Sequence, residues 1–268
     1  MLIEKQFDAG DMVLNYVESE HARPPMVLLH GLTMRWQYYL PVLPALSARW
    51  HTYALDLRGH GKSGRVKDGY RLEAYAQDCV TFLKDRAREP AVLLGHSWGG
   101  MVAIEVAVTA PELVRALVLE DPPLSNALEQ DELVRFTRFR DLVASGSSFD
   151  TIAARLADEN PGRDPVWARR RARFFTLLDP EVLTTYVEGR AMENYDTDKL
   201  LGAVSCPVLL LRADPKQGGA IRDEEEQRAL ALLRDVTLVN FPGVGHPIQA
   251  TKPDVFCRIV SDFLESLD

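Results

Sequence analysis

Cysteine is scarce in this chain of 268 residues, which holds only Cys79, Cys206 and Cys257. Their odd number and wide spacing fit neither a disulfide framework nor a metal site, so we expect buried thiols in a reducing cytoplasm. The sequence also lacks an H-E-x-x-H motif and any close grouping of histidine with cysteine, the usual zinc signatures. No expected strand is followed by G-x-G-x-x-G. The sequence therefore predicts a protein with no metal and no cofactor.

Long apolar runs and an excess of basic charge are absent as well. The longest apolar runs, such as 208–211, are far too short to cross a bilayer. The first residues, 1–5, show no apolar run after a basic start, which argues against a signal peptide. Lysine and arginine number 31 against 39 aspartates and glutamates, a net charge of −8. This charge argues against nucleic acid or an anionic membrane as partner, and we expect a cytoplasmic monomer or homodimer acting on a small molecule.

What the sequence does contain is a regular alternation of short apolar runs and helical patterns. An alternating pattern predicts a half-buried strand at 13–17, and apolar runs predict strands at 26–29, 51–57, 91–94, 116–119, 207–211 and 236–241. Helical patterns occupy 70–88, 98–110, 224–233 and 253–267. This alternation predicts an α/β fold, with a mostly parallel central sheet and helices on both of its faces.

The segment 122–203 interrupts this alternation because it contains no convincing strand. It is too long to be a loop of a compact domain, and it reads as a helical cap inserted into an α/β core formed by 1–121 and 204–268. Aromatic side chains give the cap apolar faces, and we expect Phe139 and Trp167 among those that line a substrate pocket. The four helices predicted in the cap are 131–144, 149–159, 165–178 and 180–193.

The most informative motif lies between an apolar run, 91–94, and the helical segment that starts at Trp98. Gly95, Ser97 and Gly99 form G-x-S-x-G in a strand-turn-helix context, as a nucleophile elbow requires. Glycines two residues to either side avoid a Cβ where the chain folds back sharply. The N-terminus of the following helix stabilises negative charge near the hydroxyl. We therefore predict that Ser97 is a catalytic nucleophile.

A serine nucleophile needs a base, and His246 is the best placed histidine. It lies in a glycine-containing loop, 241–247, directly after the last predicted strand. In this class of fold, ligands bind outside the carboxyl ends of the strands, where such a loop brings the imidazole. The histidines nearest the other motifs are assigned to local packing and loop shape: His30, His60 and His96.

These motifs occur in an order that resembles the α/β-hydrolase superfamily with a helical cap, over essentially the whole chain. The segments that carry the resemblance are His30-Gly31, Asp56–Ser63, Gly95–Gly99 and Gly243–His246. The resemblance implies hydrolytic chemistry without naming a substrate. It also implies an oxyanion hole made by the backbone N–H groups of Trp98 and Leu32. Such preorganised donors are each worth about 3 kcal/mol to catalysis.

The catalytic acid is ambiguous. Most members of the superfamily carry it after the penultimate strand as G-x-x-D, but here Ala213 stands for the glycine and Lys216 for the acid. Asp214 is present two residues early and suits a turn before proline. Asp121 follows the strand after the nucleophile helix, which resembles one group of haloalkane dehalogenases and the zearalenone lactonases. We predict Asp121, with Asp214 as the alternative, and Glu120 third because it faces the opposite side of the strand.

Together these features predict a cofactor-free serine hydrolase that cleaves a carboxylic ester or a lactone through an acyl-enzyme. Ser97 would attack, His246 would transfer protons and Asp121 would orient the imidazole. Cleavage of a carbon–carbon bond or an amide on the same scaffold stays open, as does a ligand-sensing protein with little turnover. Epoxide hydrolysis is disfavoured because it normally needs a carboxylate nucleophile. The sequence does not predict which substrate is used.

Overall fold

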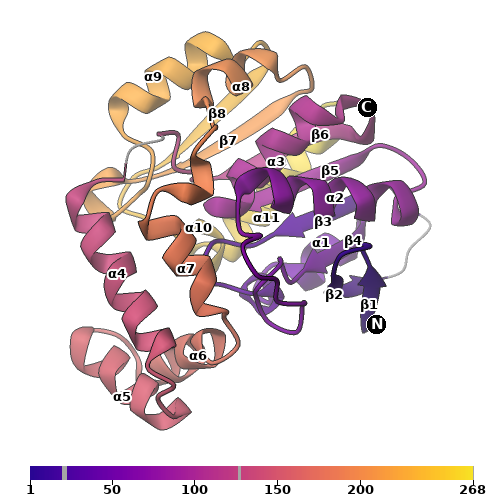
Figure 1. The fold of residues 1–268 in the computed structure, drawn as a ribbon. Coiled ribbons are helices and arrows are strands. Elements are labelled where there is room, and N and C mark those ends of the chain that lie inside the picture. The colour runs from indigo at the N-terminus through magenta and orange to yellow at the C-terminus, as the bar shows by residue number, and fades with distance from the viewer. Residues whose placement is uncertain (20–22, 126–127, 268) are drawn as a thin grey trace.

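The computed structural model describes residues 1–19, 23–125 and 128–267, and within them eight strands form one sheet. The strand order is β1-β2-β4-β3-β5-β6-β7-β8 (Figure 1). β1 and β2 pair antiparallel, β2 and β4 also, and all other neighbours pair parallel. The strands are β1 (Leu2–Asp8), β2 (Val13–Ser19), β3 (Pro25–Leu29), β4 (His51–Leu55), β5 (Ala91–His96), β6 (Val114–Glu120), β7 (Val208–Ala213) and β8 (Val236–Phe241).

Helices cover both faces of this sheet, which confirms the predicted fold class. The two faces of β3 show it: Val27 and Leu29 pack into a core shared with α2 and α3, whereas Met26 and Leu28 pack with α1 and α11. Such alternation follows from the two-residue period of a strand buried on both sides. The helices that flank the sheet are α1 (Leu43–Ser47), α2 (Leu72–Arg86), α3 (Trp98–Thr109), α9 (Asp223–Leu232), α10 (Ile248–Thr251) and α11 (Pro253–Glu265).

In the described part of the segment between β6 and β7 the regular elements are helices, as expected, apart from an isolated bridge of Leu178 with His60. It contains α4 (Gln130–Ala144), α5 (Phe149–Glu159), α6 (Pro165–Phe175), α7 (Pro180–Val187) and α8 (Thr197–Ala203). α4 packs on α7 and α5 on α6, and the four project from one side of the sheet (Figure 1). α8 instead packs on α3 and α9. The division into a core and a cap at 122–203 stays a prediction.

The sequence patterns missed β1 and the short helices α1, α8 and α10, and the third and fourth helices of the inserted segment are shorter than predicted. β1 escaped notice because it is an edge strand with mostly exposed side chains, so its sequence lacks a buried run. α8 was not expected as a separate helix. The third and fourth helices of the inserted segment end at Phe175 and Val187, earlier than predicted, because Asp179-Pro180 begins a new helix and Gly189 adopts a left-handed conformation.

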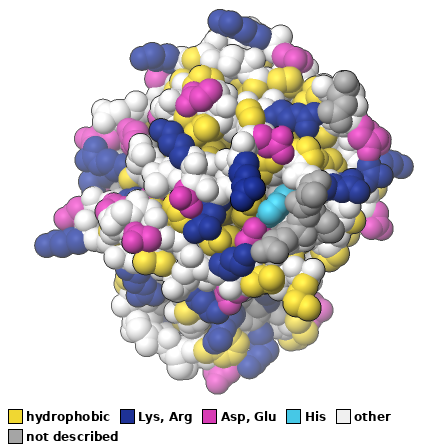
Figure 2. All heavy atoms as spheres, turned by 90° about the vertical axis from the view of Figure 1, so that its right-hand side faces the viewer, with side chains coloured by type: hydrophobic (Ala, Val, Ile, Leu, Met, Phe, Trp, Pro, Cys, Tyr) yellow, Lys and Arg dark blue, Asp and Glu magenta, His cyan; other side chains and the backbone are white. Residues whose placement is uncertain are grey.

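The surface of the molecule carries charges of both signs, and its cysteines differ in exposure. On the face seen in Figure 2, basic and acidic side chains are interspersed. Within the part of the chain that the structure describes, no helix is both long enough and apolar enough to span a membrane. The three cysteines are free thiols. Cys79 is buried as expected, but Cys206 and Cys257 are partly exposed, which corrects the expectation of three buried thiols.

Candidate active site

Ser97 lies at a sharp turn between β5 and α3, in a backbone conformation that L residues rarely adopt (φ 52°, ψ −120°). The turn is possible only because its flanking glycines lack side chains. A Cβ on Gly95 would lie 2.3 Å from the carbonyl oxygen of Gly99, and one on Gly99 would lie 1.9 Å from that of Leu29. Strain of this kind is typical of functional residues. It holds the serine side chain at the carboxyl end of the central strand.

The structure brings together His246 and Asp121, which are 125 residues apart in the sequence. The His246 Nδ1 lies 2.7 Å from Asp121 Oδ2. The Asp121 carboxylate is fully buried, and it also accepts bonds from the backbone N–H groups of Ala213 (3.1 Å) and Ala220 (2.7 Å). Three N–H groups therefore converge on this carboxylate. Asp121 itself has a positive φ of 47°, which places its side chain under the His246 ring instead of along the strand.

The two competing carboxylates have other partners. Asp214 is a partly exposed turn residue whose oxygens accept from the backbone N–H groups of Lys216 (2.9 Å) and Gly243 (2.8 Å). These bonds lower the pKa of its carboxyl group. Glu120 is fully buried on the opposite side of β6, where it accepts from the Gln249 N–H at 2.8 Å. Burial raises the pKa of Glu120 to about 8. Of the three candidates, Asp121 is the one that contacts the imidazole.

Two histidines shape the loop after β3. His30 donates from Nδ1 to the Gly31 carbonyl (2.9 Å) and accepts at Nε2 from the Leu57 N–H (3.0 Å). Burial lowers the pKa of His30 well below its usual range, so the ring is neutral and this tautomer satisfies both nitrogens. His60 Nε2 contacts the Leu32 carbonyl at 2.6 Å. Both side chains thus hold the backbone of 31–32 in place, which agrees with the loop-shaping role predicted for His30 and the structural role predicted for His60.

The backbone of this loop faces the start of α3. Trp98 is the first residue of α3, so its N–H has no acceptor within the helix. Gly31 packs tightly there, because a Cβ on it would lie 3.3 Å from the Ser97 Cβ. Gly31, Leu32 and Ser97 line one cavity. The role of the Leu32 and Trp98 N–H groups as oxyanion donors stays a prediction.

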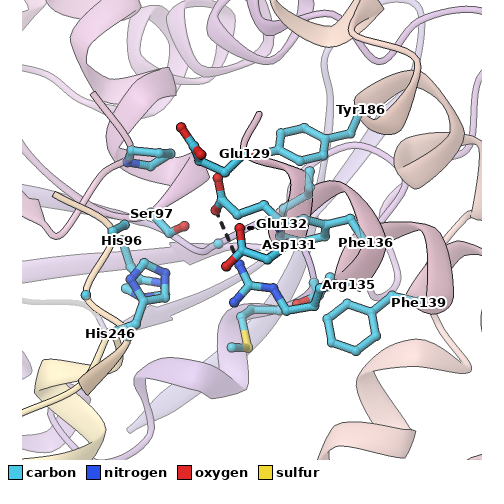
Figure 3. Close-up of a pocket in the computed structure, with 18 of the residues that line it drawn as sticks. His96, Ser97, Glu129, Asp131, Glu132, Arg135, Phe136, Phe139, Tyr186 and His246 are labelled. Carbon is cyan, nitrogen blue, oxygen red and sulfur yellow. Dashed lines mark hydrogen bonds and ion pairs between the residues drawn. The ribbon is translucent and has the colours of Figure 1, made fainter. Parts of the chain in front are cut away.

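The cavity has a volume of about 610 Å³ and separates the sheet from the inserted helices. Figure 3 shows Ser97, His96 and His246 on one side and side chains of α4 and α7 on the other. Phe139 lines it, as expected, but Trp167 does not. Trp167 lies one turn before Arg171 on α6, and its ring contacts the Arg163 guanidinium at 5.6 Å. Of these two α6 residues, Arg171 is the one that reaches the cavity.

Comparison with known proteins agrees with this arrangement. Residues 26–259 match the family model described as the alpha/beta hydrolase family. The chain belongs to the α/β-hydrolase family. This confirms the resemblance found in its motifs, and the order of the sheet agrees with it.

Relatives of this α/β-hydrolase are themselves named as hydrolases. It is 27% identical to 2-(acetamidomethylene)succinate hydrolase of Mesorhizobium japonicum, over 98% of this chain and 96% of that protein. It is also 27% identical to N-formylmaleamate deformylase of Pseudomonas putida, over 94% of this chain and 91% of that protein. A crystal structure of E-2-(acetamidomethylene)succinate hydrolase has a TM-score of 0.82 at 25% identity, covering 99% of this chain and 100% of that one.

His96, which precedes Ser97 in the chain, lies closer to the cavity and to His246 than expected. His96 was assigned to local packing, and it is indeed buried, with its ring against Tyr38 (centroids 4.6 Å apart). Its other neighbour is the His246 ring at 4.5 Å, and it lines the cavity. Burial lowers the pKa of His96 well below its usual range, so the ring is neutral. The ring that packs against His246 therefore carries no charge.

Arg171 is the residue of the hydrolase cavity that sequence reasoning missed. It lies in the run 169–173, which contains four arginines, and it is the one of them that lines the cavity. The helical period could indicate that one arginine of the run faces inward. Which one it is depends on the rotation of α6 against the core, which no local pattern reports.

Proposed function

We propose that this chain is a cofactor-free serine hydrolase that cleaves a carboxylic ester or a lactone. The observation that carries the proposal is a serine at a strained strand-to-helix turn in the same cavity as a histidine bonded to a buried carboxylate. Nucleophile, base and orienting acid are the three groups that acyl transfer needs. The substrate is a small molecule, because the cavity volume is about 610 Å³.

The contact with Asp121 selects the tautomer of His246. Because Nδ1 faces the carboxylate, the neutral ring carries its proton there and leaves Nε2 as the base. Nε2 takes the proton of Ser97 Oγ as that oxygen attacks the carbonyl carbon. The resulting imidazolium is stabilised by Asp121, which keeps its negative charge.

The collapse of the tetrahedral intermediate completes the acylation. Its oxyanion is held by the backbone N–H groups of Leu32 and Trp98. The imidazolium of His246 protonates the leaving alkoxide, and an acyl-serine remains. Water, deprotonated by the same Nε2, then attacks the acyl carbon and releases the acid and free Ser97. In a lactone, alcohol and acid leave as one opened molecule after this second step.

Turnover of p-nitrophenyl acetate by the wild-type chain and by Ser97→Ala tests the proposal. We expect many turnovers per molecule of wild-type enzyme and less than a few per cent of that rate in the variant. Release of one equivalent of nitrophenol followed by a halt would indicate a ligand-sensing protein with little turnover. Equal rates in the two proteins would exclude Ser97 as the nucleophile.

Amide cleavage is the second candidate, and the names of two relatives that match over nearly the full chain favour it. Esters and amides pass through the same tetrahedral intermediate, so Ser97 and His246 would act as above, with an amine as the leaving group. An ester and an amide of the same acyl group, assayed side by side, separate the two candidates. A larger kcat/KM for the amide would establish the second, since amides are intrinsically less reactive. Carbon–carbon bond cleavage is a further alternative. An enzyme of that kind would cleave neither the ester nor the amide.

A further inference from the structure

Arg171 is a buried cation whose side chain lines the cavity. It is 9% exposed and lies on α6, facing the loop after β3. Its Nη1 donates to the Thr33 carbonyl (3.2 Å) and to the Met34 sulfur (2.8 Å), and its Nη2 donates to the Thr33 hydroxyl (2.9 Å). Among the described residues, no carboxylate pairs with it. A thioether is a weak acceptor, so the charge is poorly compensated.

Other arginines of the chain are paired with carboxylates. Arg58, which is also buried, meets both oxygens of Asp78 through Nε (2.7 Å) and Nη2 (2.6 Å). At the cavity, Arg135 lies 3.3 Å from Glu132, as the dashed line in Figure 3 shows. An unpaired charge in such a place is costly, because burial removes its hydration. Burial lowers the pKa of Arg171 to about 10, so it remains charged at neutral pH.

The hydrogen bonds of Arg171 leave one edge of its guanidinium open. Thr33 accepts from both Nη1 and Nη2, so it occupies the edge between these two nitrogens. The other edge, formed by the Nε–H and the second Nη2–H, has no acceptor among the described side chains. This is the edge that Arg58 presents to Asp78. The ring of Phe175 lies 5.0 Å from the guanidinium and restricts its orientation. The result is an oriented pair of donors that matches two oxygens of one carboxylate.

We propose that Arg171 binds a carboxylate of the substrate, so that the preferred substrates are small acids that carry a second, cleavable acyl group. The proposal rests on the proposed function and narrows it to a substrate class. Thr33, to which Arg171 is bonded, directly follows Leu32 in the chain, which puts the bound carboxylate near the carbonyl that Ser97 attacks. The guanidinium carries one positive charge, which balances the single negative charge of a carboxylate.

The first test compares two substrates of equal shape and different charge. Monoethyl succinate carries a carboxylate where ethyl levulinate carries a neutral methyl ketone. Hydrogen bonds to a charged group are worth a factor of about 10–150 in an equilibrium, so we expect wild-type kcat/KM to favour monoethyl succinate by at least about tenfold. In Arg171→Met the ratio should fall to within about threefold of one, mainly through KM. Arg170→Met, an exposed neighbour on α6, is the matched control and should keep the wild-type ratio.

The second test measures binding without turnover, so that it stands even if ester cleavage fails. Calorimetric titration of succinate into Ser97→Ala should show binding that is lost when Arg171→Met is added and retained when Arg170→Met is added. Arg171→Lys keeps the charge but not the two-donor edge, and we expect it to bind at least about tenfold more weakly. Tighter binding of inorganic phosphate than of succinate would overturn the carboxylate class.

A purely structural role for Arg171, as a tie between α6 and Thr33, makes different predictions. Arg171→Met would then lower the melting temperature and reduce kcat/KM for both ethyl esters equally, so that the ratio of the two kcat/KM values would not change. That result, or a wild-type preference for ethyl levulinate, would overturn the proposal. If Arg171→Met fails to fold, the same ratio of kcat/KM values is measured in Arg171→Lys instead. Failure of the wild type to cleave either ester, with succinate still bound through Arg171, would refute the proposed function and leave the anion site standing.

Discussion

Replacing Asp121 by asparagine tests the catalytic arrangement most directly, because it changes charge without changing shape. Three N–H groups point at the Asp121 carboxylate: those of Ala213, Ala220 and the His246 ring. Asparagine has only one oxygen, so its NH₂ must face at least one of these donors. Each buried donor left unsatisfied costs about 1–3 kcal/mol of stability. The variant should therefore fold, with a melting temperature lower by several degrees.

The loss of activity should be far larger than the loss of stability. If the amide oxygen faces His246, the imidazolium loses the negative charge that stabilises it. If the NH₂ faces it, Nδ1 must accept, the proton moves to Nε2, and the ring can no longer act as a base. An equivalent change in a serine protease costs about 10⁴-fold in kcat, and we expect about 10³- to 10⁴-fold here. Far-ultraviolet circular dichroism and kcat on one activated ester would measure both effects.

Asp214→Asn is the matched control for this prediction. Asp214 is partly exposed, and its carboxylate accepts from the backbone N–H groups of Lys216 in its own turn and of Gly243. The asparagine side chain retains an acceptor for such a turn, so activity should stay within about tenfold of wild type. A fully active Asp121→Asn beside an inactive Asp214→Asn would refute our reasoning and place the acid after β7.

Three further outcomes are expected. Ser97→Ala and His246→Ala should each abolish ester turnover, and the double variant should be no worse than either, because the two act as a unit; a far slower double variant would contradict this coupling. Phe139→Leu should shift acyl chain-length preference, measured as kcat/KM ratios, whereas Trp167→Leu should not, since Phe139 lines the cavity and Trp167 does not. Glu120 has an ordinary pKa of 4.5 and a pKa of about 8 in the folded protein, so between these pH values the folded state binds a proton that the unfolded state has lost. The free energy of unfolding should therefore fall as pH rises through this range, by up to about 1.4 kcal/mol per pH unit. Glu120→Gln should remove that slope in urea unfolding at pH 5, 6, 7 and 8, and an unchanged slope would refute it.

The order of strands and helices was readable from the sequence because its signals are local. Buried strands of a parallel sheet are continuous apolar runs, and β3, β5, β6 and β7 were all found in this way. The elbow at Ser97 was equally readable, since its glycines are needed by the immediate backbone. β1 escaped because it lies at the edge of the sheet and exposes its side chains, which removes the apolar signal.

The sequence favoured Asp121 over Asp214 but did not exclude Asp214, because each follows a strand and each is a carboxylate. The decision depends on the register of β6 against β7. That register places the Ala213 N–H on Asp121, and the positive φ of Asp121 turns its side chain toward His246. Pairing across strands and the conformation of one residue are tertiary facts with no local pattern.

The sequence by itself thus determined the fold class, and it indicated the proposed nucleophile and the loop that carries the proposed base, since each depends on neighbours within a few residues. Only the tertiary structure decided which carboxylate meets the base and which arginine of 169–173 enters the cavity. Both contacts join segments about a hundred residues apart or more, and both depend on how rigid elements pack. Packing angles and helix rotations arise from the sum of many weak contacts across the core, so no short stretch of sequence encodes them.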